Sequence, residues 1–160
     1  MIPVRFNRVV KLLLVLAVVV LVPGALLFFW QHALIYHPRA YPSGFERMLP
    51  ARARQLAYTT AAGRQLAFYL PARSGAALPE RLWVGFTGNA SVALDWLYFT
   101  ERDPDESDAF LLIDYPGYGG SAGVANIAST RASAEEALLT LARELQIPPA
   151  ELDPRLCAFG

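Results

Sequence analysis

The 160-residue sequence has few of the side chains that build metal, redox and acid–base sites. Its only cysteine is Cys157, so no disulfide can form within the chain. It has two histidines, His32 and His37. Its formal net charge is +0, which gives no reason to expect a nucleic acid or another polyanion as a partner. The features left to interpret are a long apolar run and two glycine-containing loops.

Charged residues are absent from one run, Leu12 to Trp30. As a helix with a rise of about 1.5 Å per residue, this run would be roughly 28 Å long, close to the hydrocarbon thickness of a bilayer. Arg5, Arg8 and Lys11 precede it, and such an excess of positive charge predicts a cytoplasmic N-terminus. We therefore expect residues 12–30 to contact the lipid bilayer and the rest of the chain to lie on the extracytoplasmic (periplasmic) side.

Two alternatives to this membrane anchor remain open. A cleaved signal peptide would have the same charged start and a shorter apolar core, Leu12 to Val22. The apolar stretch continues through Trp30, however, where a cleavage region should be small and polar. This favours an uncleaved signal-anchor. The second alternative is a buried helix of a soluble protein.

The composition divides the chain into four parts. Residues 1–11 form a basic cytoplasmic N-terminus, and residues 12–30 form the transmembrane anchor. Residues 31–50 carry several prolines and are interpreted as a juxtamembrane connector. Residues 51–160 are enough for one domain, which we expect to be a partial one.

Short apolar runs in this domain alternate with helical patterns. The runs 55–60 and 65–70 predict an antiparallel hairpin. Three later runs are expected to be buried strands, with helices between them. These strands are 81–86, 109–113 and 156–159, and the helices are 91–100 and a second one from the capping box Ser133-x-x-Glu136 to about Gln146. The pattern predicts an α/β fold: an antiparallel hairpin, then a parallel βαβαβ unit, preceded by one transmembrane helix.

The first glycine-containing loop is Thr87-Gly88-Asn89-Ala90, between a predicted strand and a predicted helix. Unpaired backbone N–H groups at such a position suit an anion, such as the oxyanion formed during acyl transfer. The backbone N–H groups of Asn89 and Ala90 are the candidate oxyanion-hole donors, and Gly88 would permit the turn. The structural alternative is that Asn89 is a helix N-cap; the two roles can coexist because the cap uses the side chain.

The second loop, Asp114 to Gly123, has four glycines and a proline directly after a predicted strand. We expect it to be ordered and to support the site from beneath through Gly117, Tyr118 and Gly119. It is neither a dinucleotide-binding fingerprint nor a phosphate-binding P-loop, so no cofactor is expected.

The remaining polar groups predict no metal site and no catalytic group. The histidines flank the apolar run and are interpreted as interfacial residues, and Cys157 as a core residue. Five carboxylates around the end of a predicted helix are interpreted as solvated surface charge: Asp95, Glu101, Asp103, Asp105 and Asp108.

Together the two loops resemble the membrane-anchored branch of the α/β-hydrolase superfamily, which includes the Bem46-like and ABHD-type serine hydrolases. Those proteins commonly show His-Gly-Asn-Ala, then Tyr-Arg/Pro-Gly-Tyr-Gly-x-Ser-x-Gly, and then the nucleophile elbow Gly-x-Ser-x-Gly. Residues 34–38 are also similar to the segment after the anchor in that group. Thr87 replaces the family histidine and Ser91 a frequent glycine, but neither change removes a backbone N–H donor.

The resemblance implies the N-terminal half of an α/β-hydrolase sheet and a serine hydrolase acting on ester, thioester or amide bonds of a small acyl substrate. Gly160 stands where the first glycine of the elbow is expected, and the nucleophile, acid and base would follow it in that order. No catalytic residue is therefore expected within this chain, which we predict to be a truncated part that is inactive alone. The alternative is a non-catalytic membrane-anchored binding module or a degenerate hydrolase remnant.

Overall fold

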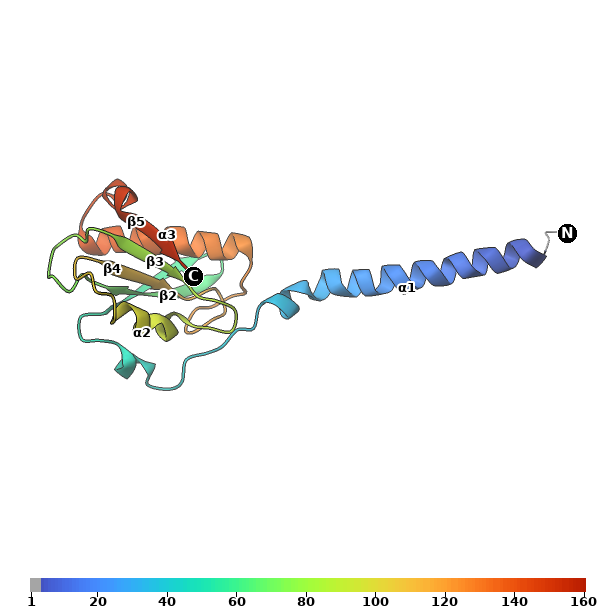
Figure 1. The fold of residues 1–160 in the computed structure, drawn as a ribbon, viewed down its shortest axis with the longest axis horizontal. Helices are drawn as coiled ribbons and strands as arrows, with labels where there is room; N and C mark the ends of the chain where they lie inside the picture. The colour runs from blue at the N-terminus through green and yellow to red at the C-terminus, as the bar shows by residue number, and fades with distance from the viewer. Residues whose placement is uncertain (1–3) are drawn as a thin grey trace. The chain divides into compact units, whose positions relative to one another are not determined.

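The computed structural model describes the backbone of residues 4–160. The side chains of residues 4–6, 32 and 33 lie outside the described residues, and so do the predicted roles of Arg5 and His32. The chain forms two compact units, Met1–Ile35 and Tyr36–Gly160. Figure 1 shows a helix in the first unit and a sheet with helices in the second.

The first unit is the helix α1 (Val4–Ile35), which continues through Pro23. The segment Asn7–Gln31 is long and apolar enough to cross a membrane, and none of its most apolar window is buried. The predicted span 12–30 lies inside this segment.

The second unit is built on a mixed sheet with the strand order β1-β2-β4-β3-β5. Strands β1 (Arg54–Thr60) and β2 (Gly63–Leu70) form an antiparallel hairpin, and β2 pairs antiparallel with β4 (Ala109–Ile113). Strand β3 (Leu82–Phe86) lies between β4 and β5 (Leu156–Phe159) and is parallel to both. The structure confirms the predicted fold class, a hairpin followed by a parallel βαβαβ unit (Figure 1).

The crossover after β3 is shorter than the predicted helix 91–100. It consists of a 3₁₀ helix, η2 (Ala93–Trp96), and one α-helical turn, α2 (Leu97–Thr100). The N-cap position is Val92, and the Asp95 carboxylate accepts a hydrogen bond from the Val92 N–H at 3.1 Å. The prediction that Asn89 caps a helix is therefore wrong.

The helix α3 (Ile127–Leu145) begins well before the predicted capping box. Asn126 is its N-cap and exchanges hydrogen bonds with Ser129, at 2.9 and 3.0 Å. Ser133 is instead buried within the helix, with its hydroxyl 2.9 Å from the Tyr58 hydroxyl. The predicted box fails because an earlier Asn–Ser pair already satisfies the first N–H groups.

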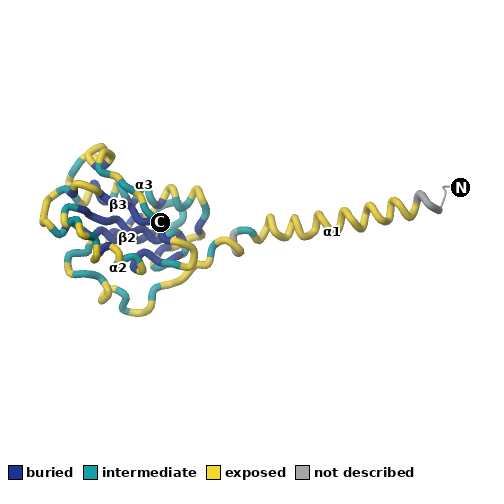
Figure 2. The backbone as a smooth tube through the Cα atoms, in the orientation of Figure 1, coloured by how far each residue is buried: buried dark blue, intermediate teal, exposed yellow. Residues whose placement is uncertain are grey.

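Both faces of the sheet are covered, by α3 on one side and by η2 with part of the connector on the other. Figure 2 shows the strands as the most buried part of the unit. Strand β4 is buried at every position.

Strand β5 is an edge strand, which pairs only with β3 among the described residues. The prediction that β5 is a buried strand and Cys157 a core residue is wrong, since Cys157 is only half-buried. Further 3₁₀ turns are η1 (Phe45–Met48), η3 (Pro149–Glu151) and η4 (Asp153–Arg155).

Candidate functional site

The segments singled out by the sequence lie at the carboxyl edge of the parallel strands. The loop 87–90 follows β3, the loop 114–123 follows β4, and Gly160 follows β5. A Cβ added to Gly160 would lie only 2.7 Å from the carbonyl oxygen of Phe86, so the end of β5 lies against the end of β3. Ligands of open parallel sheets bind at this edge.

The Asn89 side chain joins the first loop to two other segments. Its Oδ1 accepts hydrogen bonds from the His37 backbone N–H at 2.9 Å and from the Tyr118 hydroxyl at 3.3 Å. Both bonds use the Asn89 side chain. The backbone N–H of Asn89, one of the two predicted oxyanion donors, takes part in neither of them.

The strained position in this loop is Ala90, not Gly88. Ala90 has a φ of 59°, in the left-handed region, and Gly88 is not in that region. A left-handed conformation costs an L-residue about 1–2 kcal/mol, so the surrounding contacts must hold it. One contact is the turn in which the Ser91 N–H donates to the Gly88 carbonyl at 3.2 Å.

Tyr118, one of the predicted supporting residues, contacts the first loop through its hydrogen bond to Asn89. It is 1% exposed, and burial raises the pKa of its hydroxyl, while the backbone N–H groups of His37 and Ala90 oppose the rise. Its hydroxyl therefore lies beside Ala90, the second predicted oxyanion donor. Gly117, with a φ of 84°, allows the close approach of the loop to Gly123.

Asp114 is a site residue that sequence reasoning passed over. It is fully buried, and its Oδ1 accepts hydrogen bonds from the Ala93 N–H and the Tyr41 hydroxyl, each at 2.9 Å. Burial raises the pKa of this carboxyl to about 6, although these two hydrogen bonds and a third from the Gly120 backbone lower it. The sequence feature that could have identified Asp114 is its position directly after a fully apolar strand.

The connector is folded onto both loops, which its proline-rich composition did not indicate. The Gly119 N–H donates to the Arg39 carbonyl at 2.8 Å, and Ala40 forms a parallel bridge with Gly119. The Arg39 guanidinium pairs with Asp95 at 2.5 Å.

The five carboxylates interpreted as surface charge are mostly paired with arginines. Asp105 and Asp108 both contact Arg81, and Asp108 also accepts a hydrogen bond from the Trp83 indole N–H at 2.6 Å. The Asp108 side chain is 1% exposed, so the surface interpretation is wrong for this residue. In the part of the chain that the structure describes, no group of three or more His, Cys, Asp or Glu residues could hold a metal ion.

Residues 119–123 fit the letters of the Gly-x-Ser-x-Gly pattern. A nucleophile elbow needs an exposed serine on a strand-to-helix turn. Ser121 instead lies in a loop, is 9% exposed, and accepts a hydrogen bond through Oγ from the Leu66 N–H on β2 at 2.9 Å. Its position is structural.

Replacing Ser121 by alanine should lower the free energy of unfolding by about 1–3 kcal/mol, because the buried Leu66 N–H loses its acceptor. The measurement is denaturant unfolding of the full chain in micelles. The matched control Ser43→Ala, at an exposed connector position, should change stability by less than about 0.5 kcal/mol. Equal effects of the two substitutions would contradict the structural role of Ser121.

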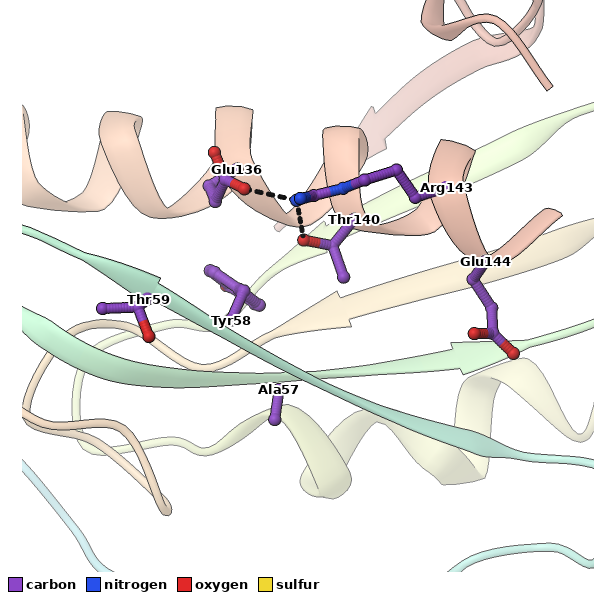
Figure 3. A pocket seen from close by; sticks show the side chains of 7 residues that line it. All are labelled: Ala57, Tyr58, Thr59, Glu136, Thr140, Arg143 and Glu144. Carbon is purple, nitrogen blue, oxygen red and sulfur yellow. Dashed lines mark hydrogen bonds and ion pairs between the residues drawn. The ribbon is translucent and has the colours of Figure 1, made fainter. Parts of the chain in front are cut away.

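Several concavities lie on the second unit, and two of them are the largest described there. The groove in Figure 3, of about 520 Å³, lies between β1 and α3, and its charged groups pair with other side chains. Arg143 binds Glu136 at 2.5 Å and Thr140 at 2.9 Å, and Glu144 binds Arg54 at 3.2 Å. The second, of about 490 Å³, lies at the carboxyl edge and is mainly apolar; its lining includes Phe86, Tyr115, Ile127 and Leu138. Only the second adjoins the two loops and offers space for an apolar group there.

Neither a protein-family profile nor a curated protein matches the sequence. Among solved structures, the crystal structure of alpha-beta hydrolase from Vibrio vulnificus aligns with 61% of this chain, at a TM-score of 0.45 and 16% sequence identity. The alignment covers 32% of that hydrolase, so this chain spans about a third of its length. The case for a function accordingly rests on the loops at the carboxyl edge.

Proposed function

We propose that this chain is the N-terminal part of a membrane-anchored serine hydrolase that acts on an ester, thioester or amide of a small acyl substrate. One observation carries the proposal. The two glycine-containing loops and Gly160 follow three neighbouring parallel strands and come together at one edge of the sheet. Their order along the chain is the order of the motifs in the family that the sequence resembles.

In this proposal the Asn89 loop supplies part of an oxyanion hole. A serine beyond Gly160 gives its proton to the base and attacks the carbonyl carbon. The carbonyl π electrons move to the oxygen, which the backbone N–H of Asn89 stabilises, since the Ala90 N–H already faces the Tyr118 hydroxyl. Collapse of the intermediate expels the alcohol, thiol or amine, which takes a proton from the base. Water then releases the acid from the acyl-enzyme.

The first test uses the chain of residues 1–160 alone. It should not react with a serine-directed phosphonate, because the proposal assigns the nucleophile to residues beyond Gly160. Covalent labelling that disappears in the variant Ser121→Ala would contradict this assignment, and would make the loop 119–123 the nucleophile elbow.

The proposed location follows from α1 and the basic residues before it: cytoplasmic N-terminus, single membrane span, and domain on the extracytoplasmic (periplasmic) side. In a Cys157→Ser background, the variant Ser74→Cys places the only thiol on an exposed loop of the domain. A membrane-impermeant maleimide should label it in intact cells, with the protein at its uncleaved size. Labelling only after lysis would reverse the orientation, and a shortened protein would indicate a cleaved signal peptide.

A further inference from the structure

Three segments far apart in the sequence meet at the buried side chain of Asp114. The carboxylate lies at the end of β4 and accepts hydrogen bonds from the connector, through the Tyr41 hydroxyl, and from the start of η2, through the Ala93 N–H. The Tyr41 hydroxyl in turn accepts a hydrogen bond from the Leu94 N–H at 3.3 Å. Asp114 and Tyr41 together therefore hold the segment that directly follows the Asn89 loop.

The same three segments are also joined around this carboxylate. The His37 N–H donates to the Asn89 side chain, and the Gly119 N–H donates to the Arg39 carbonyl. The Tyr41 ring is fixed by stacking on Phe45, with ring centroids 4.4 Å apart. The connector thus contacts the Asn89 loop and the glycine-rich loop within a few residues of each other.

No cation compensates the charge of Asp114 among the described side chains that face it. The titratable neighbours are Tyr41 from the connector, Tyr58 from β1 and Asp95 from η2, and the nearby cation Arg39 is paired with Asp95. The Asp114 Oδ2 is buried without a side-chain partner, beside the backbone of Gly119, and a hydrogen bond from the Gly120 backbone lowers the pKa of the carboxyl without offsetting its burial. A buried, uncompensated carboxylate is costly to ionise.

We propose that Asp114 is a positioning residue that ties the Asn89 loop to the connector, so that the loop and the connector open and close as one unit. Its importance for an oxyanion hole rests on the proposed function. The coupling between the two segments rests only on the contacts around Asp114.

The opening equilibrium of the loop and connector depends on pH, and the direction of the change follows from the pKa of Asp114 in the closed and open states. When the unit opens, water reaches the carboxyl group and its pKa falls from about 6 toward the ordinary value of 3.8. The closed state therefore binds the proton more tightly, and acid favours closing, whereas opening increases as the pH rises through about 6. A difference of about two pKa units limits the change in the opening equilibrium to about 100-fold.

Hydrogen–deuterium exchange of the full chain in lipid nanodiscs tests this coupling, with peptides covering residues 36–45 and 87–97. After correction for the intrinsic exchange rate, protection in both peptides should fall together from pH 5 to pH 8, by about 10-fold. In Asp114→Asn, which keeps the Oδ1 acceptor and cannot ionise, protection should not change with pH. Tyr41→Phe should lower protection in both peptides.

The control Tyr58→Phe removes a buried hydroxyl bond to Ser133 and should leave both peptides protected. The proposal is overturned if the two peptides respond independently, if Asp114→Asn keeps the wild-type pH dependence, or if every variant lowers protection equally across β2, β4 and α3. The exchange readout needs no activity. If exchange in the two peptides is coupled but the protein has no nucleophile, only the hydrolase proposal is wrong. If the protein is an active hydrolase but exchange in the two peptides is independent, only the proposed coupling is wrong.

Discussion

Replacing Gly119 by alanine should lower the free energy of unfolding by about 3 kcal/mol or more, the largest effect expected of any single methyl group in the domain. Gly119 has a φ of 57°, a left-handed conformation that an L-residue adopts at a cost. The added Cβ would also overlap the Asp114 carboxylate and lie 2.6 Å from the Tyr41 ring. Neither group can move aside without breaking the hydrogen bonds that join the connector to the loops.

Gly75 provides the matched control for this substitution. Its φ of 75° is also left-handed, but a Cβ there would meet nothing within 4 Å. Gly75→Ala should therefore cost only the conformational part, about 1–2 kcal/mol. Chemical unfolding followed by circular dichroism, with the full chain in micelles, compares the two variants. Equal costs would show that the close packing around Asp114 is wrong.

The second large effect is the pH dependence of stability that Asp114 contributes. Its pKa is raised in the folded state to about 6 from an ordinary value of 3.8, so the folded state binds the proton more tightly. This contribution is fully present below the unfolded pKa and is lost as the pH rises through about 6. Between pH 3.5 and pH 8 the loss should reach about 3 kcal/mol.

The difference in unfolding free energy between Asp114→Asn and the wild type isolates this contribution, because all other titrating groups cancel. The difference should rise by about 3 kcal/mol in favour of the variant from pH 3.5 to pH 8. In Tyr41→Phe the carboxylate loses a hydrogen bond that lowers its pKa, so the midpoint of the wild-type change should move to higher pH. A flat difference curve would mean that Asp114 is not a buried, uncompensated carboxylate.

The strands were predictable because their signals are local. Strand β4 has the predicted bounds, and the hairpin differs by one or two residues at its ends. These segments are apolar runs ended by glycine, proline or polar residues. Such a pattern predicts a strand without any knowledge of the tertiary contacts. The start of α3 was missed because two capping pairs compete in the sequence, and the local pattern favoured the later one.

The site was predictable only in part. The sequence indicated which loops reach the carboxyl edge of the sheet, since that follows from the order of strands and helices. It did not indicate that Asn89 binds the connector, because His37 lies 52 positions away and donates through its backbone. It did not single out Asp114 either, whose importance comes from burial and from the absence of a cation around it. Contacts of this kind are set by tertiary packing.

The most direct test of the hydrolase proposal is labelling with a serine-directed phosphonate in membranes of the source organism. The polypeptide that yields peptides from residues 36–160 should carry the phosphonate on a serine in a Gly-x-Ser-x-Gly sequence that begins at Gly160, and should retain residues 1–35. If that polypeptide is intact in the membrane and stays unlabelled while other serine hydrolases react, the chain belongs to a non-catalytic anchored protein and the proposed function is wrong.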